Sequence, residues 1–100
     1  MKVRFADTAK ISLHTAINFI QQDNPTAAAN FLDRVEKTLR RLENFPDSGR
    51  RIPEFPELPY RELLVVPYRF FYRVEGKTIF VVAVWHTAQI PTEPKKLKGV

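Results

Sequence analysis

The chain has 100 residues and no cysteine, with 16 lysines and arginines against 11 aspartates and glutamates. This length fits one domain, and the lack of cysteine excludes disulfides and thiolate metal sites. No apolar run reaches the roughly 18 residues of a membrane span, and the N-terminus does not resemble a signal peptide, so we expect a cytoplasmic protein without membrane contact. The net charge of +5 favours anionic partners, although a solvated basic surface explains it equally well.

The first segment, residues 2–6, alternates apolar and basic side chains, which predicts a short strand with Val3 and Phe5 on its buried face. Asp7 follows directly and is expected to cap a helix, since its carboxylate suits the free backbone N–H groups of a first turn. Apolar residues then recur at helical spacing until Asp23, where the helix should end.

A second helix is predicted from the pair Asn24 and Pro25, because asparagine caps helices and proline suits the first helical position. Its apolar residues follow in steps of three or four as far as about Asn44. They are Ala28, Phe31, Leu32, Val35, Leu39 and Leu42. The linker is short, so the two helices should form an antiparallel hairpin.

Residues 50–59 contain three prolines and are interpreted as a loop. Three segments rich in β-branched and aromatic residues follow, at 60–66, 68–74 and 78–85, with a turn at Gly76 before the last. They predict a three-stranded antiparallel meander.

In the last strand, strict alternation would place one set of side chains on one face and the rest on the other. The first set is Ile79, Val81, Ala83 and Trp85, and the second is Phe80, Val82 and Val84. Both sets are apolar, so the strand should be covered on both faces. Tyr68 and Tyr72 are expected to pack with their hydroxyls at the surface.

The predicted fold class is therefore α+β: an N-terminal strand, an antiparallel helical hairpin and a three-stranded antiparallel meander. The N-terminal strand should pair beside the meander, with the hairpin on one face. Residues 1–90 are predicted to form this single domain, and residues 91–100 a basic C-terminal tail.

Several sequence segments, in their order along the chain, resemble those of the RelE/ParE toxin superfamily. They lie at residues 24–31, 39–42, 45–50, 68–74 and 85–86, and the resemblance covers about residues 1 to 90. It implies a toxin of a type II toxin–antitoxin module, held by a cognate antitoxin in a hetero-oligomer, with no cofactor and no metal. Activity divides within the superfamily. RelE-like members cut messenger RNA on the ribosome, ParE-like members inhibit DNA gyrase by binding, and a third group is a non-toxic binding module.

For an RNA-cleaving toxin, the resemblance implies Arg69 and His86 as site residues, with Arg61 in support. The match has gaps: Thr87 stands where a tyrosine commonly follows the histidine, and the acidic stretch 54–57 weakens a groove for RNA. The ParE-like branch is therefore favoured, and it needs no catalytic residue.

Structural explanations stand beside these roles. His86 is better explained as a strand-end histidine that hydrogen-bonds to backbone than as an acid–base catalyst. Arg69 is explained equally well by an ion pair across the sheet with Glu62 or Glu75.

A partner surface is predicted from exposed aromatic and basic side chains, because eight phenylalanines are too many to bury in a small domain. Phe45 and Phe55 belong to this exposed set, and Trp85 is a candidate anchor if it is not buried. The candidates for partner binding are Phe19, Phe31, Arg40, Arg41, Trp85, Lys95, Lys96 and Lys98.

Overall fold

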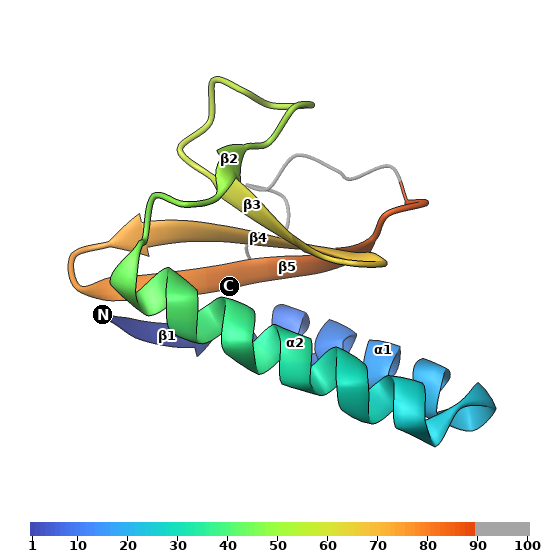
Figure 1. Cartoon of the computed structure of the whole chain (residues 1–100). Coiled ribbons are helices and arrows are strands. Elements are labelled where there is room, and N and C mark those ends of the chain that lie inside the picture. Colours follow the sequence, from blue (N-terminus) through green and yellow to red (C-terminus); the bar gives the residue numbers. More distant parts are fainter. Residues whose placement is uncertain (90–100) are drawn as a thin grey trace.

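The computed structural model describes residues 1–89, in which a helical hairpin packs on one face of a five-stranded mixed sheet (Figure 1). The elements in chain order are β1 (Lys2–Phe5), α1 (Asp7–Asp23), α2 (Pro25–Asn44), β2 (Arg50–Arg51), β3 (Arg61–Val65), β4 (Tyr68–Glu75) and β5 (Thr78–His86). The predicted α+β class is confirmed. The tail predicted for residues 91–100 lies outside the described residues.

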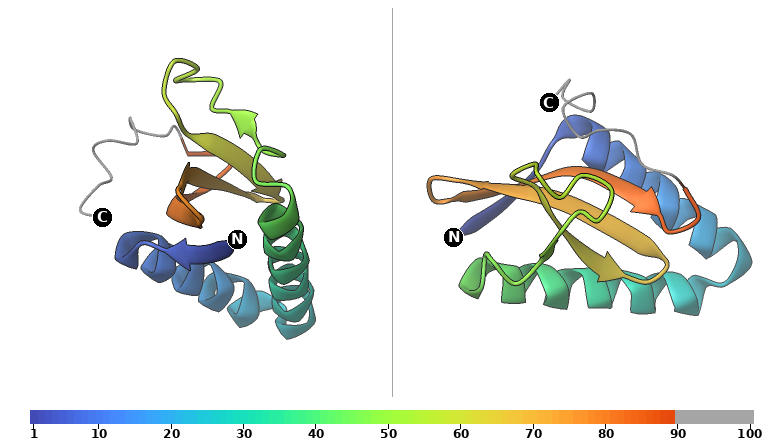
Figure 2. Two further views of the ribbon diagram at one scale, coloured as in Figure 1. Left: turned by 90° about the vertical axis from the view of Figure 1, so that its left-hand side faces the viewer. Right: turned by 90° about the horizontal axis from the view of Figure 1, so that it is seen from above.

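The sheet has the strand order β1-β5-β4-β3-β2. Strands β3, β4 and β5 form the predicted antiparallel meander, and β1 joins it by pairing in parallel with residues 78–81 of β5. The segment predicted as a loop begins with a short strand instead, because Arg50 and Arg51 pair with Glu62 and Arg61 of β3. The loop that follows β2 rises on the side of the sheet away from the helices (Figure 2).

Helix α2 begins as predicted. The side-chain oxygen of Asn24 accepts a hydrogen bond from the backbone N–H of Ala27 at 3.0 Å, and Pro25 fills the first helical position. The prediction that Asp7 caps α1 is wrong, because Asp7 is already helical and the preceding Ala6 makes no side-chain cap. The sheet fixes the start of α1 instead, because the N–H of Ala6 donates to the carbonyl of Val81 at 2.9 Å.

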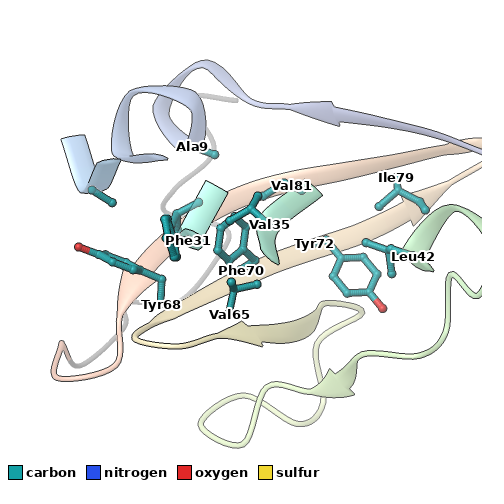
Figure 3. Packing of buried hydrophobic residues seen from close by; sticks show 12 residues of the cluster. Ala9, Phe31, Val35, Leu42, Val65, Tyr68, Phe70, Tyr72, Ile79 and Val81 are labelled. Atoms are coloured by element: carbon teal, nitrogen blue, oxygen red, sulfur yellow. The ribbon is translucent and has the colours of Figure 1, made fainter. Parts of the chain in front are cut away.

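The sheet separates two apolar clusters. The larger lies between the sheet and the helices, and Figure 3 shows its side chains from α1, α2 and the sheet strands. The smaller lies on the opposite face, under the loop. It comprises Ile52, Tyr60, Phe71, Val82 and Ala83, with Phe55, Leu58, Phe80 and Trp85 packed against it. We call these two sides the helix face and the loop face.

Strand β5 contains one residue more than its partner. Phe71 lies opposite Ala83, but the next residue of β4, Tyr72, lies opposite Val81, so Val82 is the additional residue of a β-bulge. A bulge breaks the strict alternation of side chains between the two faces.

The predicted division of β5 side chains is therefore wrong beyond the bulge. Val84 lies in the helix-face cluster, while Ala83 and Trp85 lie in the loop-face cluster. His86 follows on the helix face, where its ring meets that of Tyr68 edge-on at a centroid distance of 5.2 Å.

The predicted surface position of the Tyr72 hydroxyl is also wrong. Tyr72 is fully buried beside Leu42 (Figure 3). Its hydroxyl donates to the carbonyl of Pro46 at 2.7 Å and accepts from the N–H of Gly49 at 2.9 Å. Backbone groups from the turn after α2 thus satisfy a polar atom inside the core.

Candidate functional site

The three residues implied for RNA cleavage do not converge. Arg69 lies opposite Trp85 on the loop face, whereas His86 lies opposite Tyr68 on the helix face. The sheet itself therefore separates the arginine from the histidine. Groups on opposite faces of one sheet cannot approach the same scissile phosphate from hydrogen-bond distance.

Arg61 is distant from His86 along the sheet. Its partner on β4 is Tyr72, four residues from Tyr68, and four residues of strand span about 13 Å. The guanidinium of Arg61 donates to the carbonyl of Gly49 at 2.9 Å. Arg61 thus supports the turn after α2 and does not join Arg69 or His86.

Arg69 is buried in a cluster of charges on the loop face. Its Nε donates to Oε1 of Glu62 at 2.6 Å, and its two terminal nitrogens donate to Glu54, Nη1 to Oε2 at 3.0 Å and Nη2 to Oε1 at 2.7 Å. Arg50 donates from Nε to the other oxygen of Glu62 at 2.6 Å. We call these four residues the Arg69 cluster.

The charges of the Arg69 cluster cancel, with two arginines against two carboxylates. The hydrogen bond from Arg69 lowers the pKa of Glu54, although burial acts in the opposite direction. The same contact raises the pKa of Arg69. Each group thus holds its partner in the charged state.

The sequence predicted only part of this cluster. Glu62 is one of the two predicted partners of Arg69, but the other, Glu75, pairs with Arg73 at 3.0 Å. Glu54 was missed as a partner, because it lies in a loop whose path over the sheet has no local signature. The available signal was Glu62 itself, an acidic residue within an apolar strand that must be paired if buried.

His86 makes the local contacts that its structural explanation requires. Its Nδ1 accepts from the N–H of Ala88 at 3.0 Å, and its backbone N–H donates to the side-chain oxygen of Gln89 at 2.7 Å. The N–H of Gln89 donates a hydrogen bond to the carbonyl of His86 at 2.9 Å. The histidine thus organises the turn that ends β5.

A groove of about 570 Å³ lies between α1 and the end of β5, and it is largely apolar. Two of its side chains are the most exposed large apolar residues of the described part of the chain, Ile11 at 65% and Phe19 at 64%. The groove is lined by Thr8, Ile11, Ser12, Thr15, Ala16, Phe19, Tyr68, Val82, Ala83, Val84, Trp85, His86 and Gln89.

The backbone of β5 is open beside this groove. Strand β1 pairs only with residues 78–81, so residues 82–86 have no neighbouring strand on that side within the described chain. Gln89 occupies the backbone groups of His86, and none of residues 1–89 forms a strand beside the part of β5 that precedes His86 on this side. An open edge beside an apolar groove is a geometry that binds extended peptides.

The predicted partner residues are dispersed. Phe19 lines the groove, and Arg40 and Arg41 are exposed on α2. Phe31 is 1% exposed and packs against Tyr68, so this candidate presents no surface to a partner. Among the remaining candidates, Trp85 is half-buried, and Lys95, Lys96 and Lys98 lie outside the described residues.

Within residues 1–89, no group of three or more histidine, cysteine, aspartate or glutamate side chains is placed to hold a metal ion. Neither α1 nor α2 is long and apolar enough to cross a membrane.

Comparison with known families decides the membership of the chain. The profile described as the ParE toxin of the type II toxin–antitoxin system parDE matches residues 3–91. The chain belongs to the ParE toxin family. The predicted resemblance to RelE/ParE toxins and the preference for the ParE-like branch are therefore confirmed.

The fold of this ParE-family chain also matches a solved structure, described as the chromosomal ParDE system from P. aeruginosa. The TM-score is 0.69 at 20% sequence identity, and the match covers 86% of this chain and 95% of that one. At this identity the likeness concerns the fold. No significant match was found among curated protein sequences.

Proposed function

We propose that this ParE-family toxin inhibits DNA gyrase by binding, without catalysis, and that a cognate antitoxin neutralises it in the cytoplasm. The Arg69 cluster is the observation that carries the proposal. An RNA-cleaving toxin needs a free cation for the scissile phosphate and a nearby acid–base group. Here Arg69 is saturated by two carboxylates, and His86 lies on the other face of the sheet.

The groove between α1 and β5 is the surface that we assign to the antitoxin. Ile11 and Phe19 offer apolar contact, and the edge of β5 that β1 leaves unpaired within residues 1–89 offers backbone hydrogen bonds. Together they suit an extended antitoxin segment that adds beside β5 and inserts apolar side chains under α1. The positive net charge of the toxin favours an acidic segment.

Two reactions run side by side test the target: DNA supercoiling by gyrase, and cleavage of messenger RNA on programmed ribosomes. We expect lost supercoiling with intact RNA. Cut RNA with normal supercoiling would refute the proposal and make Arg69 and His86 the first residues to mutate. No effect in either reaction, and no growth defect on expression, would identify a non-toxic binding module.

The antitoxin surface has its own test. Phe19→Ser should weaken antitoxin binding by about tenfold or more, since truncation of an aromatic anchor typically costs over 1 kcal/mol. Phe45→Ser is the matched control, because Phe45 is 62% exposed but lies outside the groove. Equal losses in both variants, measured by calorimetric titration, would place the antitoxin elsewhere.

A further inference from the structure

The loop of residues 52–60 covers the loop face of the sheet (Figure 2). Within this loop, the carboxylate of Glu54 contacts the buried guanidinium of Arg69. In the Arg69 cluster, the side chain of Glu62 is completely buried and that of Arg69 is 8% exposed, whereas that of Glu54 is 40% exposed. Glu54 is therefore the partner of Arg69 on the solvent side.

The contact between Arg69 and Glu54 has the form of an arginine bound to an oxyanion. Two terminal nitrogens meet two oxygens at 3.0 and 2.7 Å, a parallel pair of hydrogen bonds. Arginine binds the oxygens of phosphate with the same planar fork. The carboxylate of Glu54 thus occupies the position that two phosphate oxygens would take.

The rest of the cluster holds the fork in place without Glu54. Arg69 stays fixed through its Nε, which donates to Glu62 at 2.6 Å, and Glu62 is held in turn by Arg50 at 2.6 Å. The ring of Phe71 lies under the guanidinium, 5.1 Å from its central carbon. Without the carboxylate of Glu54, the two arginines and one remaining glutamate leave a net charge of +1 beside solvent.

We propose that Glu54 is the built-in occupant of an anion-binding fork formed by Arg69, so that the loop of residues 52–60 covers a latent site for a phosphate group. The fork selects two oxygens in one plane, which a free phosphate and a phosphodiester both present. Displacement of Glu54, by substitution or by movement of the loop, uncovers the fork. This inference goes beyond the proposed inhibition of gyrase, and neither Glu54 nor Arg69 is among the residues that line the antitoxin groove.

The test is Glu54→Ala, titrated with inorganic phosphate and with a short oligothymidylate at low salt. We expect the variant to bind at least about tenfold more tightly than the wild type, equivalent to about 1.4 kcal/mol. Tightening for phosphate alone identifies a site for a small anion, and tightening for both ligands a site for a phosphodiester. Glu54→Gln, which removes the charge but keeps the volume, replaces the alanine variant if that one does not fold.

Glu57→Ala is the matched control. Glu57 is exposed in the same loop and takes part in none of the ion pairs found among residues 1–89, so the variant gains the same net charge. Equal tightening in the Glu54 and Glu57 variants would overturn the proposal, because general attraction to a more basic protein would then explain the binding. No tightening in either folded variant would overturn it as well.

The location of the anion is tested by nuclear magnetic resonance of the arginine side chains in the Glu54→Ala protein. Phosphate should shift the Nε–H resonance of Arg69 in a saturable manner. The double variant Glu54→Ala with Arg69→Lys should lose the gained affinity, because lysine keeps the charge but not the fork. Shifts confined to exposed arginines would show adventitious binding and refute the site.

Discussion

Replacement of Tyr72 by phenylalanine would remove one oxygen from the core and leave two backbone groups without their partner. The N–H of Gly49 is buried and would lose the acceptor at 2.9 Å, and the carbonyl of Pro46 would lose the donor at 2.7 Å. A buried group left unsatisfied costs about 1–3 kcal/mol. Pro46 is half-buried and regains water in part, so we expect a total loss of about 2–3 kcal/mol in the free energy of unfolding.

Urea denaturation followed by circular dichroism measures this loss as a lower midpoint at an unchanged m-value. The melting temperature should fall by roughly 8–24 °C, since 1 kcal/mol corresponds to about 4–8 °C in a domain of this size. Tyr68→Phe is the control, because Tyr68 lies on the same face of β4 and its hydroxyl makes no hydrogen bond with residues 1–89. If both variants unfold at the wild-type midpoint, the turn after α2 is not held by Tyr72.

The remaining predictions concern the same turn and the Arg69 cluster. Gly49→Ala should lower the free energy of unfolding by at least about 2 kcal/mol, since the added carbon would lie 2.6 Å from the Tyr72 ring. Gly76→Ala, at φ +60° in open space, should lower it by only about 1 kcal/mol in the same thermal denaturation experiment. The second prediction is a pH dependence. Because Arg69 holds the pKa of Glu54 below its usual value of 4.5, this pair stabilises the fold above that pH, and the contribution is lost as pH falls through the lower, folded value. The free energy of unfolding, measured at decreasing pH, should lack this loss in the Glu54→Gln variant. If the variant and the wild type lose stability equally as pH falls, the pair does not contribute in this way.

Local patterns predicted the elements because each has a strong local cause. Helix α2 follows from its cap at Asn24 and from apolar residues at helical spacing, and both are as expected. The hairpin between β4 and β5 follows from the turn at Gly76, the one glycine with positive φ in the described chain. These features depend on neighbours in sequence, which the sequence displays directly.

The errors arose where distant segments meet. The entry into α1 is set by the hydrogen bond from Ala6 to Val81, so the nearby Asp7 was not needed as a cap. The hydroxyl of Tyr72 is buried because the turn after α2 brings Pro46 and Gly49 to it. Neither the start of α1 nor the buried hydroxyl of Tyr72 can be predicted from the spacing of apolar residues, since each depends on a contact between segments far apart in the sequence.

The relative positions of Arg69 and His86 could not be predicted from the sequence either, and they bear on function. Arg69 and His86 were both recognised from the sequence, and strict alternation along β5 would have placed them on the same face. The single additional residue Val82 reverses the alternation, so that Trp85 and not His86 lies beside Arg69. One residue of register thus separates the two groups that an RNA-cleaving toxin would need together. The same shift brings His86 to the groove beside α1, where it lines the surface that we assign to the antitoxin.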